Sequence, residues 1–329
     1  MEKLFIFCAL LSFFLSLFFT ALTSRFGLKL GLIDTPNERS SHTAIIPRSG
    51  GIGIWVAFIL TGLLFTQFQI FAILAGIVGL IGFLEDRFSI SQKIRLVLKL
   101  IISALVVSLF LGMPTSLTAV LLFLFWLLFI TGTANFYNFM DGIDGIAGFT
   151  GFVGFGLIAI FSFYVAEKSN IALISVALSL GCLGFLPFNF PKAKVFMGDV
   201  GSLLLGFVFA SFVIKLSSGI CEFLCIIMFL CMFYADALLT IFCRWKRGEN
   251  LIMAHRSHLY QYLCNELKMP HWKVSLSYAL TQFVIAVLAL LAYKKGIVWQ
   301  IIVFVLFGAM FLVAYKFIKR IKPRLALSL

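Results

Sequence analysis

Long, continuous apolar segments recur along almost the whole chain, and they constrain its fold more than any other feature. A helix of roughly 20 mostly apolar residues crosses the ~30 Å hydrocarbon layer of a bilayer. The segments lack the two-residue alternation of an outer-membrane barrel, which excludes that fold. The sequence therefore predicts an all-α, polytopic integral membrane helical bundle of about 11 transmembrane helices, forming a single domain over 1–329. The predicted helices lie near 3–22, 51–66, 69–84, 96–112, 117–137, 146–166, 171–188, 200–216, 220–242, 274–292 and 298–317.

Composition supports a membrane protein and excludes a water-soluble one. Hydrophobic residues make up 62% of the chain and charged residues 12%, so the chain cannot cover a water-facing surface of ordinary size. The seven cysteines form no CxxC pair and lie mostly inside predicted helices, where they act as small buried apolar residues.

Basic residues indicate how the chain is oriented. If the first helix enters the cytoplasm near Thr23, 21 of the 26 Lys and Arg residues fall on the cytoplasmic side. The N-terminus is then outside, and the first segment is an uncleaved helix because its basic residues follow it. The net charge of +13 is a signal of topology and of attraction to anionic headgroups, and it does not imply nucleic-acid binding.

Most of the reactive side chains lie on the predicted cytoplasmic side. The five carboxylates Glu85, Asp86, Asp141, Asp144 and Asp199 each occur where an apolar segment meets that side. Any one of them alone is typical of a solvated loop end. Because three separate loops carry them to one membrane face, we expect them to converge in one cleft.

The segment NFMDGIDGIAG (138–148) carries two of these carboxylates and four glycines. Its spacing suits one helical face, but Gly142 and Gly145 favour a loop or a helix start. Glycine also allows backbone N–H groups to approach an anion closely. An EF-hand is excluded because ligands do not occur at every second position.

The segment NFPKAKVFMGDVGS (189–202) places Asp199 between two glycines, just before a helix. Helix-start N–H groups and a carboxylate can together hold a metal-bound phosphate. Carboxylates at open positions suit Mg²⁺, which retains waters and binds substrate phosphates. Lys192 and Lys194 are either phosphate ligands or anchors that flank a membrane helix.

A third segment, RWKRGENLIMAHRSHLYQYL (244–263), contains His255 and His258 at an i, i+3 spacing. A zinc pair is not favoured, because no third ligand is evident and no HExxH motif is present. Arg256 as a phosphate ligand and His258 as a proton-handling or hydrogen-bonding group fit an acidic cleft better.

Together, these motifs and two further segments resemble one family, the polyprenyl-phosphate N-acetylhexosamine-1-phosphate transferases of glycosyltransferase family 4. The matching segments are IDTPNERSSHTAIIPRSGG (33–51), GFLEDRFSISQKIRL (82–96), NFYNFMDGIDGIAG (135–148), FNFPKAKVFMGDVGS (188–202) and HRSHLYQ (255–261). The resemblance implies transfer of a sugar 1-phosphate from a UDP-N-acetyl sugar to undecaprenyl phosphate, with release of UMP. It places the enzyme in the bacterial inner membrane with a cytoplasmic active site, as a monomer or a homodimer.

The resemblance also assigns residue roles. Asp199 resembles the ligand of Mg²⁺, or of Mn²⁺ in its place, and Phe196 the aromatic residue that packs on uracil. Glu85 and Asp86 match a pair of aspartates proposed to handle the lipid phosphate. The complete assignment gives catalysis to Glu85, Asp86, Asp141, Asp144 and His258, and substrate binding to His42, Asn138, Asn189, Phe196, Lys93 and Arg256.

Two positions depart from the family pattern. Glu85 stands where the family has aspartate, so its carboxylate is one methylene further from the backbone. The last inner loop reads HLYQ instead of HLHH, which points away from the peptidoglycan branch and towards the O-antigen type.

Two other classes of membrane protein were compared with these features. A transporter usually binds its substrate near the bilayer midplane and shows internal repeats, whereas here only Asp236 lies well inside a predicted helix and no repeat is evident. A CDP-alcohol phosphotransferase requires DGxxAR, and neither Asp-Gly pair of this chain is followed by Ala-Arg.

Overall fold

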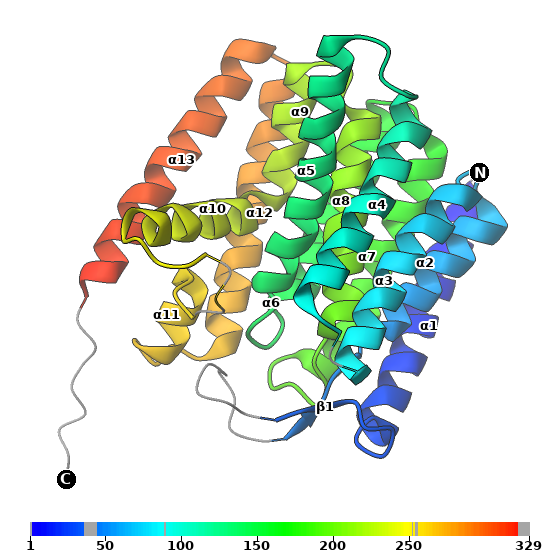
Figure 1. Ribbon diagram of the computed structural model, residues 1–329, viewed down its shortest axis with the longest axis vertical. Coiled ribbons are helices and arrows are strands. Elements are labelled where there is room, and N and C mark those ends of the chain that lie inside the picture. The colour runs from blue at the N-terminus through cyan, green and yellow to red at the C-terminus, as the bar shows by residue number, and fades with distance from the viewer. Residues whose placement is uncertain (1, 36–44, 89, 252, 254–255, 322–329) are drawn as a thin grey trace.

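The computed structural model describes residues 2–35, 45–88, 90–251, 253 and 256–321, and it is a bundle of helices (Figure 1). Among these residues, ten helices are long and apolar enough to cross a membrane, which confirms the predicted all-α, polytopic class. The elements are α1 (Glu2–Phe26), β1 (Ile33–Asp34), β2 (Ile46–Pro47), α2 (Ile52–Phe65), α3 (Gln69–Phe88), α4 (Gln92–Leu111), α5 (Leu117–Phe139), α6 (Ile146–Tyr164), α7 (Ser169–Asn189), α8 (Gly198–Leu216), α9 (Ile220–Ile227), η1 (Met228–Leu230), α10 (Cys231–Lys246), α11 (Leu259–Asn265), α12 (His271–Tyr293) and α13 (Ile297–Arg320).

Helix α8 forms the centre of the bundle. It is the most buried of the ten candidate spans, and it packs between α3 and α5. Gly206 permits the close approach to α5, since a Cβ there would lie 2.8 Å from the Thr133 carbonyl oxygen. Because α8 begins at Gly198, this packing places Asp199 among the ends of α3, α4 and α5.

The segment predicted as a span over 51–66 forms a helix of only 14 residues, Ile52–Phe65. At 1.5 Å per residue it is about 21 Å long, which is less than the hydrocarbon thickness. Before α2, Gly50 N and Gly51 N donate to the carbonyl oxygens of Phe196 and Met197. The helix begins and ends within one residue of the predicted bounds, and these two bonds attach its start to the start of α8.

The segment predicted as one helix over 220–242 is broken. Leu230 leaves the helical conformation (φ −127°, ψ 24°), and α10 lies across the bundle instead of continuing along α9 (Figure 1). The break is stabilised by Gln282 of α12, whose Nε2 donates to Phe229 O at 2.7 Å and to Thr150 O at 3.1 Å. Irregular backbone at membrane depth requires such partners, because lipid offers none.

This arrangement predicts that Gln282→Leu destabilises the protein. Loss of the amide donor leaves the Phe229 carbonyl buried without that hydrogen bond, at a cost of about 1–3 kcal/mol. Gln300→Leu is the matched control, because Gln300 donates to Ala289 O, a carbonyl inside a regular helix. We expect thermal unfolding in detergent to show a clearly larger decrease in melting temperature for Gln282→Leu than for Gln300→Leu. Equal decreases would contradict this explanation of the break.

Candidate functional site

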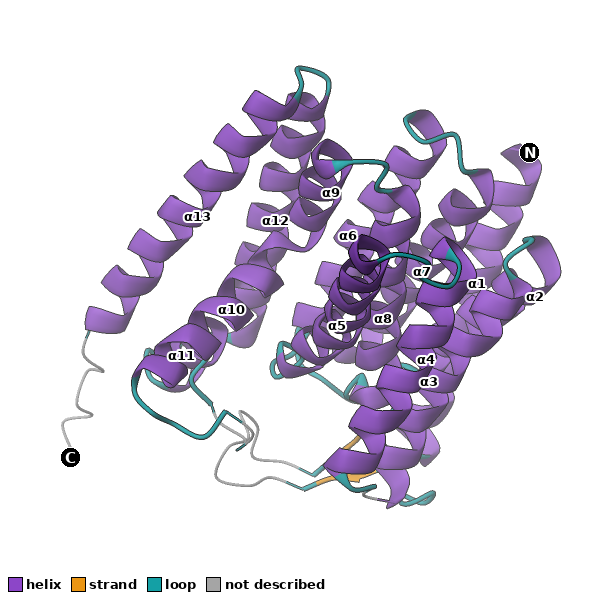
Figure 2. Cartoon of the chain, turned by 45° about the horizontal axis from the view of Figure 1, so that its top comes forward, coloured by secondary structure: helices purple, strands orange, loops and turns teal. Residues whose placement is uncertain are grey.

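The loops that carry the carboxylate motifs meet at one end of the bundle, which is the lower end in Figure 1. Figure 2 shows the two short strands at this same end. The strands pair antiparallel, with Ile33 opposite Pro47 and Asp34 opposite Ile46. Residue Pro47 is bonded in turn to the loop before α8, because Phe196 N donates to its carbonyl oxygen at 2.9 Å. The loop between α1 and α2 is therefore attached to the Asp199 motif.

Asp86 is buried and holds the start of α8 in place. Its side chain is 1% exposed; Oδ1 accepts from the backbone N–H of Asp199 at 3.2 Å, and Oδ2 accepts from Ser49 Oγ at 2.6 Å. Arg48 Nη1 lies 3.7 Å from the same carboxylate. Gly198 has φ +74°, and a Cβ there would collide with Asp86 Oδ2, so glycine is required for both reasons. Asp86 thus fixes the position of Asp199.

Arg95 of α4 connects the other two carboxylates of the cluster. Its guanidinium lies 3.1 Å from Glu85 Oε1 and 3.2 Å from Asp199 Oδ2. Asn138 completes the surroundings of Asp199, donating to Oδ1 at 2.8 Å and to Ser202 Oγ at 2.9 Å. The Asp199 side chain remains 24% exposed, so a ligand can reach it. We call Glu85, Asp86, Arg95, Asn138 and Asp199 the acidic cluster.

The sequence reasoning placed Lys93 and Arg95 near Glu85 but assigned only Lys93 to the site. Lys93 is exposed, whereas Arg95, two residues further along α4, faces the carboxylates. Positions two apart on a helix do not share a face, which explains the difference. Lys99, one turn beyond Arg95, was also missed; it is 5% exposed and its ammonium donates to Asn135 Oδ1. The i, i+4 spacing of Arg95 and Lys99 is the signal that could have identified both.

Asn189 connects the two glycine-containing loops. Its Oδ1 accepts from Gly145 N at 2.7 Å and its Nδ2 donates to Val195 O at 2.9 Å. Gly145 itself adopts φ +82° at the start of α6, where a side chain would be strained. Asn189 is buried, with 4% of the residue exposed. Its side chain therefore holds the Asp144–Gly145 loop against the segment that leads to Asp199.

Asp144 is paired with a histidine that the sequence reasoning did not consider. Asp144 Oδ2 lies 3.2 Å from His271 Nδ1, and Ser275 Oγ donates to the Asp144 carbonyl oxygen at 2.6 Å. Both partners are in the first two turns of α12. The pairing directs this carboxylate towards α12, and the 144–271 separation in sequence offered no local signal.

Asp141 lies in the loop between α5 and α6 and is half-buried. Burial, followed by the negative charges of Asp199 and Asp86, raises the pKa of Asp141 to about 8. The Asp141 carboxyl is then largely protonated at neutral pH in the metal-free protein.

The elevated pKa predicts a pH-dependent stability. An acid with a higher pKa in the folded than in the unfolded state contributes stability below its ordinary pKa of 3.8 and loses it as pH rises towards 8. In metal-free buffer we expect the melting temperature to decrease between pH 5 and pH 8, and Asp141→Asn to remove much of that decrease. Glu249→Gln, at a carboxylate paired with Arg244 and Arg247, serves as control. An unchanged pH profile for Asp141→Asn would exclude Asp141 as the titrating group.

His258 is buried beside Asp236 of α10, with Nδ1 3.6 Å from Asp236 Oδ1. The Asp236 carboxylate also accepts from Leu259 N at 2.8 Å, Tyr260 N at 3.2 Å and Tyr278 Oη at 2.8 Å. It therefore caps the first turn of α11. Tyr260 extends this connection to the α5–α6 loop, since its Oη donates to Phe139 O at 2.9 Å. Asp236, the carboxylate that lies inside an apolar segment, is therefore part of the framework of the site.

Some of the remaining predicted residues are described by the structure and others are not. Phe196 is half-buried, and Arg256, Lys192 and Lys194 are exposed. His42 and His255 lie outside the described residues.

The oxygen atoms of the acidic cluster fit a hard divalent cation. Among the described residues, no three His, Cys, Asp or Glu side chains form a complete metal site. Mg²⁺ does not need one, because it retains waters and binds substrate phosphates beside one or two carboxylates. Glu85 Oε2 is buried and accepts no hydrogen bond from the described residues, so it and Asp199 are the two candidate ligand groups.

Fold and site together define a polytopic membrane protein with an acidic, arginine-containing cluster at one end of its helical bundle. Residues 68–217 match the model of the family described as glycosyl transferase family 4. This match supports the resemblance to the polyprenyl-phosphate N-acetylhexosamine-1-phosphate transferases that the sequence motifs indicated.

Three bacterial relatives are similar to the chain. A probable undecaprenyl-phosphate N-acetylglucosaminyl 1-phosphate transferase of Bacillus subtilis is 30% identical over 205 residues, covering 58% of this chain and 57% of the relative. An undecaprenyl-phosphate alpha-N-acetylglucosaminyl 1-phosphate transferase of Thermotoga maritima is 31% identical, covering 60% of each. The Salmonella typhi protein of the same description is 28% identical over 351 residues, covering 96% of this chain and 94% of the relative. The matches to the first two relatives thus span less than two thirds of their lengths.

Proposed function

We propose that the protein transfers N-acetylhexosamine 1-phosphate from a UDP-sugar to undecaprenyl phosphate and releases UMP. An oxygen of the lipid phosphate attacks the β-phosphorus of the UDP-sugar, and the bond between that phosphorus and the UMP oxygen breaks. The observation that carries the proposal is the acidic cluster, in which Arg95 connects Glu85 and Asp199 at one end of the helical bundle. The names of the three relatives make N-acetylglucosamine the first sugar to test.

Phosphoryl transfer depends on positioning and on neutralisation of charge, and the cluster offers both. Asn138 orients Asp199 through a 2.8 Å hydrogen bond, and Asp86 fixes the backbone N–H of Asp199. Arg95 is a cation held 3.2 Å from Asp199 and is placed to meet phosphate oxygens. Mg²⁺, or Mn²⁺, held by Asp199 with Glu85 would supply further neutralisation of the diphosphate charge when bound.

The lipid phosphate is already an anion near neutral pH, so it requires orientation more than deprotonation. Glu85 is the more accessible member of the acidic pair, with a side chain 17% exposed against 1% for Asp86. We assign orientation of the nucleophile to Glu85 and Arg95, and support of Asp199 to Asp86. Removal of a last proton by Glu85 would contribute modestly.

On the nucleotide side, Phe196 is assigned to the uracil ring, and Asp144 and His258 to the walls of the same site. His258 acts through its buried pairing with Asp236, which holds the first turn of α11. Lys93 and Arg256 are assigned to the entrance, where exposed cationic groups would attract the anionic donor. His42, outside the described residues, is assigned to the same substrate.

The site is assigned to the cytoplasmic face, with the N-terminus outside, and the product to O-antigen synthesis. The distribution of 21 of 26 basic residues and the HLYQ sequence support these assignments. A cysteine at exposed Ser91, in a variant without the seven native cysteines, should resist an impermeant thiol reagent added to intact cells. A cysteine at exposed Lys294, between α12 and α13, should react under the same conditions. The opposite pattern would reverse the orientation.

The activity is tested with purified protein, undecaprenyl phosphate, Mg²⁺ and a panel of UDP-N-acetyl sugars. We expect UMP release to depend on both the lipid and the metal, with UDP-N-acetylglucosamine as the best donor. Absence of UMP release with every donor, from protein that is folded by its melting profile, would refute the proposed function.

A further inference from the structure

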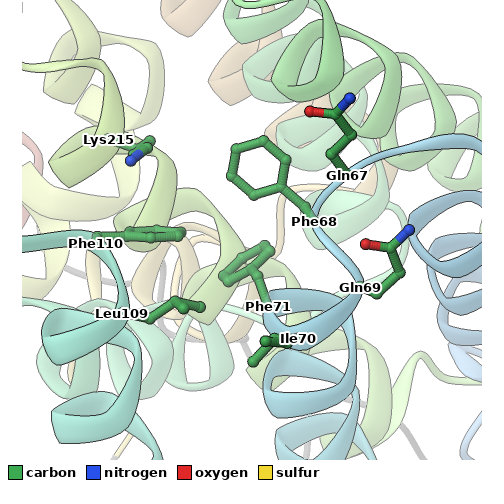
Figure 3. A pocket seen from close by; sticks show the side chains of 8 residues that line it. All are labelled: Gln67, Phe68, Gln69, Ile70, Phe71, Leu109, Phe110 and Lys215. Atoms are coloured by element: carbon green, nitrogen blue, oxygen red, sulfur yellow. The ribbon is translucent and has the colours of Figure 1, made fainter.

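A pocket of about 210 Å³ opens between α3, α4 and α8, at the end of the bundle opposite the acidic cluster (Figure 3). The first turn of α3 and the last turns of α4 and α8 form it. Three rings lie against one another in its walls: Phe71 and Phe110 have centroids 5.3 Å apart, and Phe68 lies 6.4 Å from Phe71 and 6.2 Å from Phe110. Gln67 and Gln69 also line the pocket, so its walls combine this aromatic cluster with polar side chains.

One cation, Lys215, lines this pocket. Its ammonium lies over the Phe110 ring, 5.2 Å from the centroid. A second cation is close, since Lys168 Nζ donates to the Lys215 carbonyl oxygen. Neither lysine takes part in any of the ion pairs formed within the part of the chain that the structure describes. Burial and the charge of Lys215 lower the pKa of Lys168, as expected for two neighbouring cations without an anion.

An apolar track leads away from the pocket along the surface of the bundle. Ile70 at its mouth is 62% exposed, and Ile73 and Ile77 continue the same exposed face of α3. Leu105 and Leu109 form the corresponding exposed face of α4. From Ile70 to Ile77 the exposed face of α3 runs for about 10 Å, most of the ~15 Å hydrocarbon depth of one leaflet, so it can take part of an acyl chain.

We propose that this pocket binds one anionic phospholipid, with its phosphate at Lys215 and Lys168 and an acyl chain along Ile70, Ile73 and Leu109. Charge complementarity selects this occupant, because the cationic pair has no carboxylate partner among the described residues and the Phe110 ring lies beneath Lys215. The site is distinct from the acidic cluster and does not depend on the proposed transferase activity.

The test is native mass spectrometry of the purified protein with equal amounts of phosphatidylglycerol and phosphatidylcholine that carry the same acyl chains. We expect one retained phosphatidylglycerol in preference to phosphatidylcholine, and about fivefold weaker retention by Lys215→Gln, which corresponds to about 1 kcal/mol. Lys295→Gln is the matched control: Lys295 also lies over an aromatic ring, Trp299 at 5.0 Å, at the same end of the bundle but outside the pocket. Its retention of lipid should be unchanged.

A second variant tests the pocket without changing charge. Ile70→Trp fills the mouth, so it should lower retention of phosphatidylglycerol while both lysines remain. Equal retention of the two lipids, unchanged retention by Lys215→Gln or Ile70→Trp, or an equal loss in Lys295→Gln would overturn the proposal. Displacement of the lipid by inorganic phosphate alone would also overturn it, since the apolar track would then contribute nothing. Melting profiles of all variants establish that each is folded.

Discussion

Asp199→Asn is expected to lower sugar-phosphate transfer at least about a hundredfold while the protein stays folded. An asparagine can still accept the Asn138 hydrogen bond, and the backbone N–H that binds Asp86 is unchanged. The substitution removes only the negative charge that faces Arg95 and would face a divalent cation. The loss should therefore appear in the turnover rate and persist at saturating Mg²⁺.

Glu249→Gln is the control for this experiment, because Glu249 pairs with Arg244 and Arg247 and has no ion pair with the acidic cluster. Its rate of UMP release should remain within about twofold of the unmodified protein. Near-normal turnover by Asp199→Asn, or an equal loss in both variants, would remove Asp199 from the assigned role.

Asp86→Asn is expected to have a larger effect than Glu85→Gln. Both carboxylate oxygens of Asp86 accept hydrogen bonds, one from Ser49 Oγ and the other from Asp199 N. An asparagine has only one acceptor oxygen, so its N–H₂ group would face one of these two donors. The start of α8 would shift, and a misplacement of about 1 Å can lower a rate roughly a hundredfold. Glu85→Gln retains one acceptor oxygen for Arg95, so we expect only about a tenfold decrease.

Glu85→Asp separates placement from charge. If Glu85 orients the lipid phosphate, shortening the side chain should raise the lipid concentration needed for half-maximal rate, and Asp86→Asn should lower the maximal rate instead. Rates measured across a range of undecaprenyl phosphate concentrations distinguish these effects, with melting temperatures as the check on folding. A decrease for Glu85→Gln as large as that for Asp86→Asn would contradict the supporting role given to Glu85.

Local features of the sequence were sufficient to predict the bundle, because apolar length is a local property. The break after α9 was less predictable. It depends on Gln282, which lies far along the chain from Phe229, so the apolar segment alone suggests one complete helix over 220–242.

In the candidate site, too, local features could be predicted from the sequence, whereas contacts between distant residues could not. The glycines beside Asp199 and Asp144 indicated where backbone and carboxylates approach, and the structure brings Asp199, Asp86, Glu85 and Asn138 together. The partner of each charge was harder to predict. To predict Arg95 as the partner of Glu85, one must know which face of α4 points towards the cluster. To predict the pairing of Asp144 with His271, one must know how α12 packs in the bundle.

Transfer of the β-phosphorus is the most direct test of the proposed chemistry. With UDP-N-acetylglucosamine labelled by ³²P at the β-phosphate, we expect the label to move into the extracted lipid together with the sugar, with one UMP released for each label transferred. Asp199→Asn should abolish this transfer, and Glu249→Gln should retain it. Appearance of the sugar in the lipid without the label, accompanied by labelled UDP, would contradict the account, because the enzyme would then transfer the sugar alone.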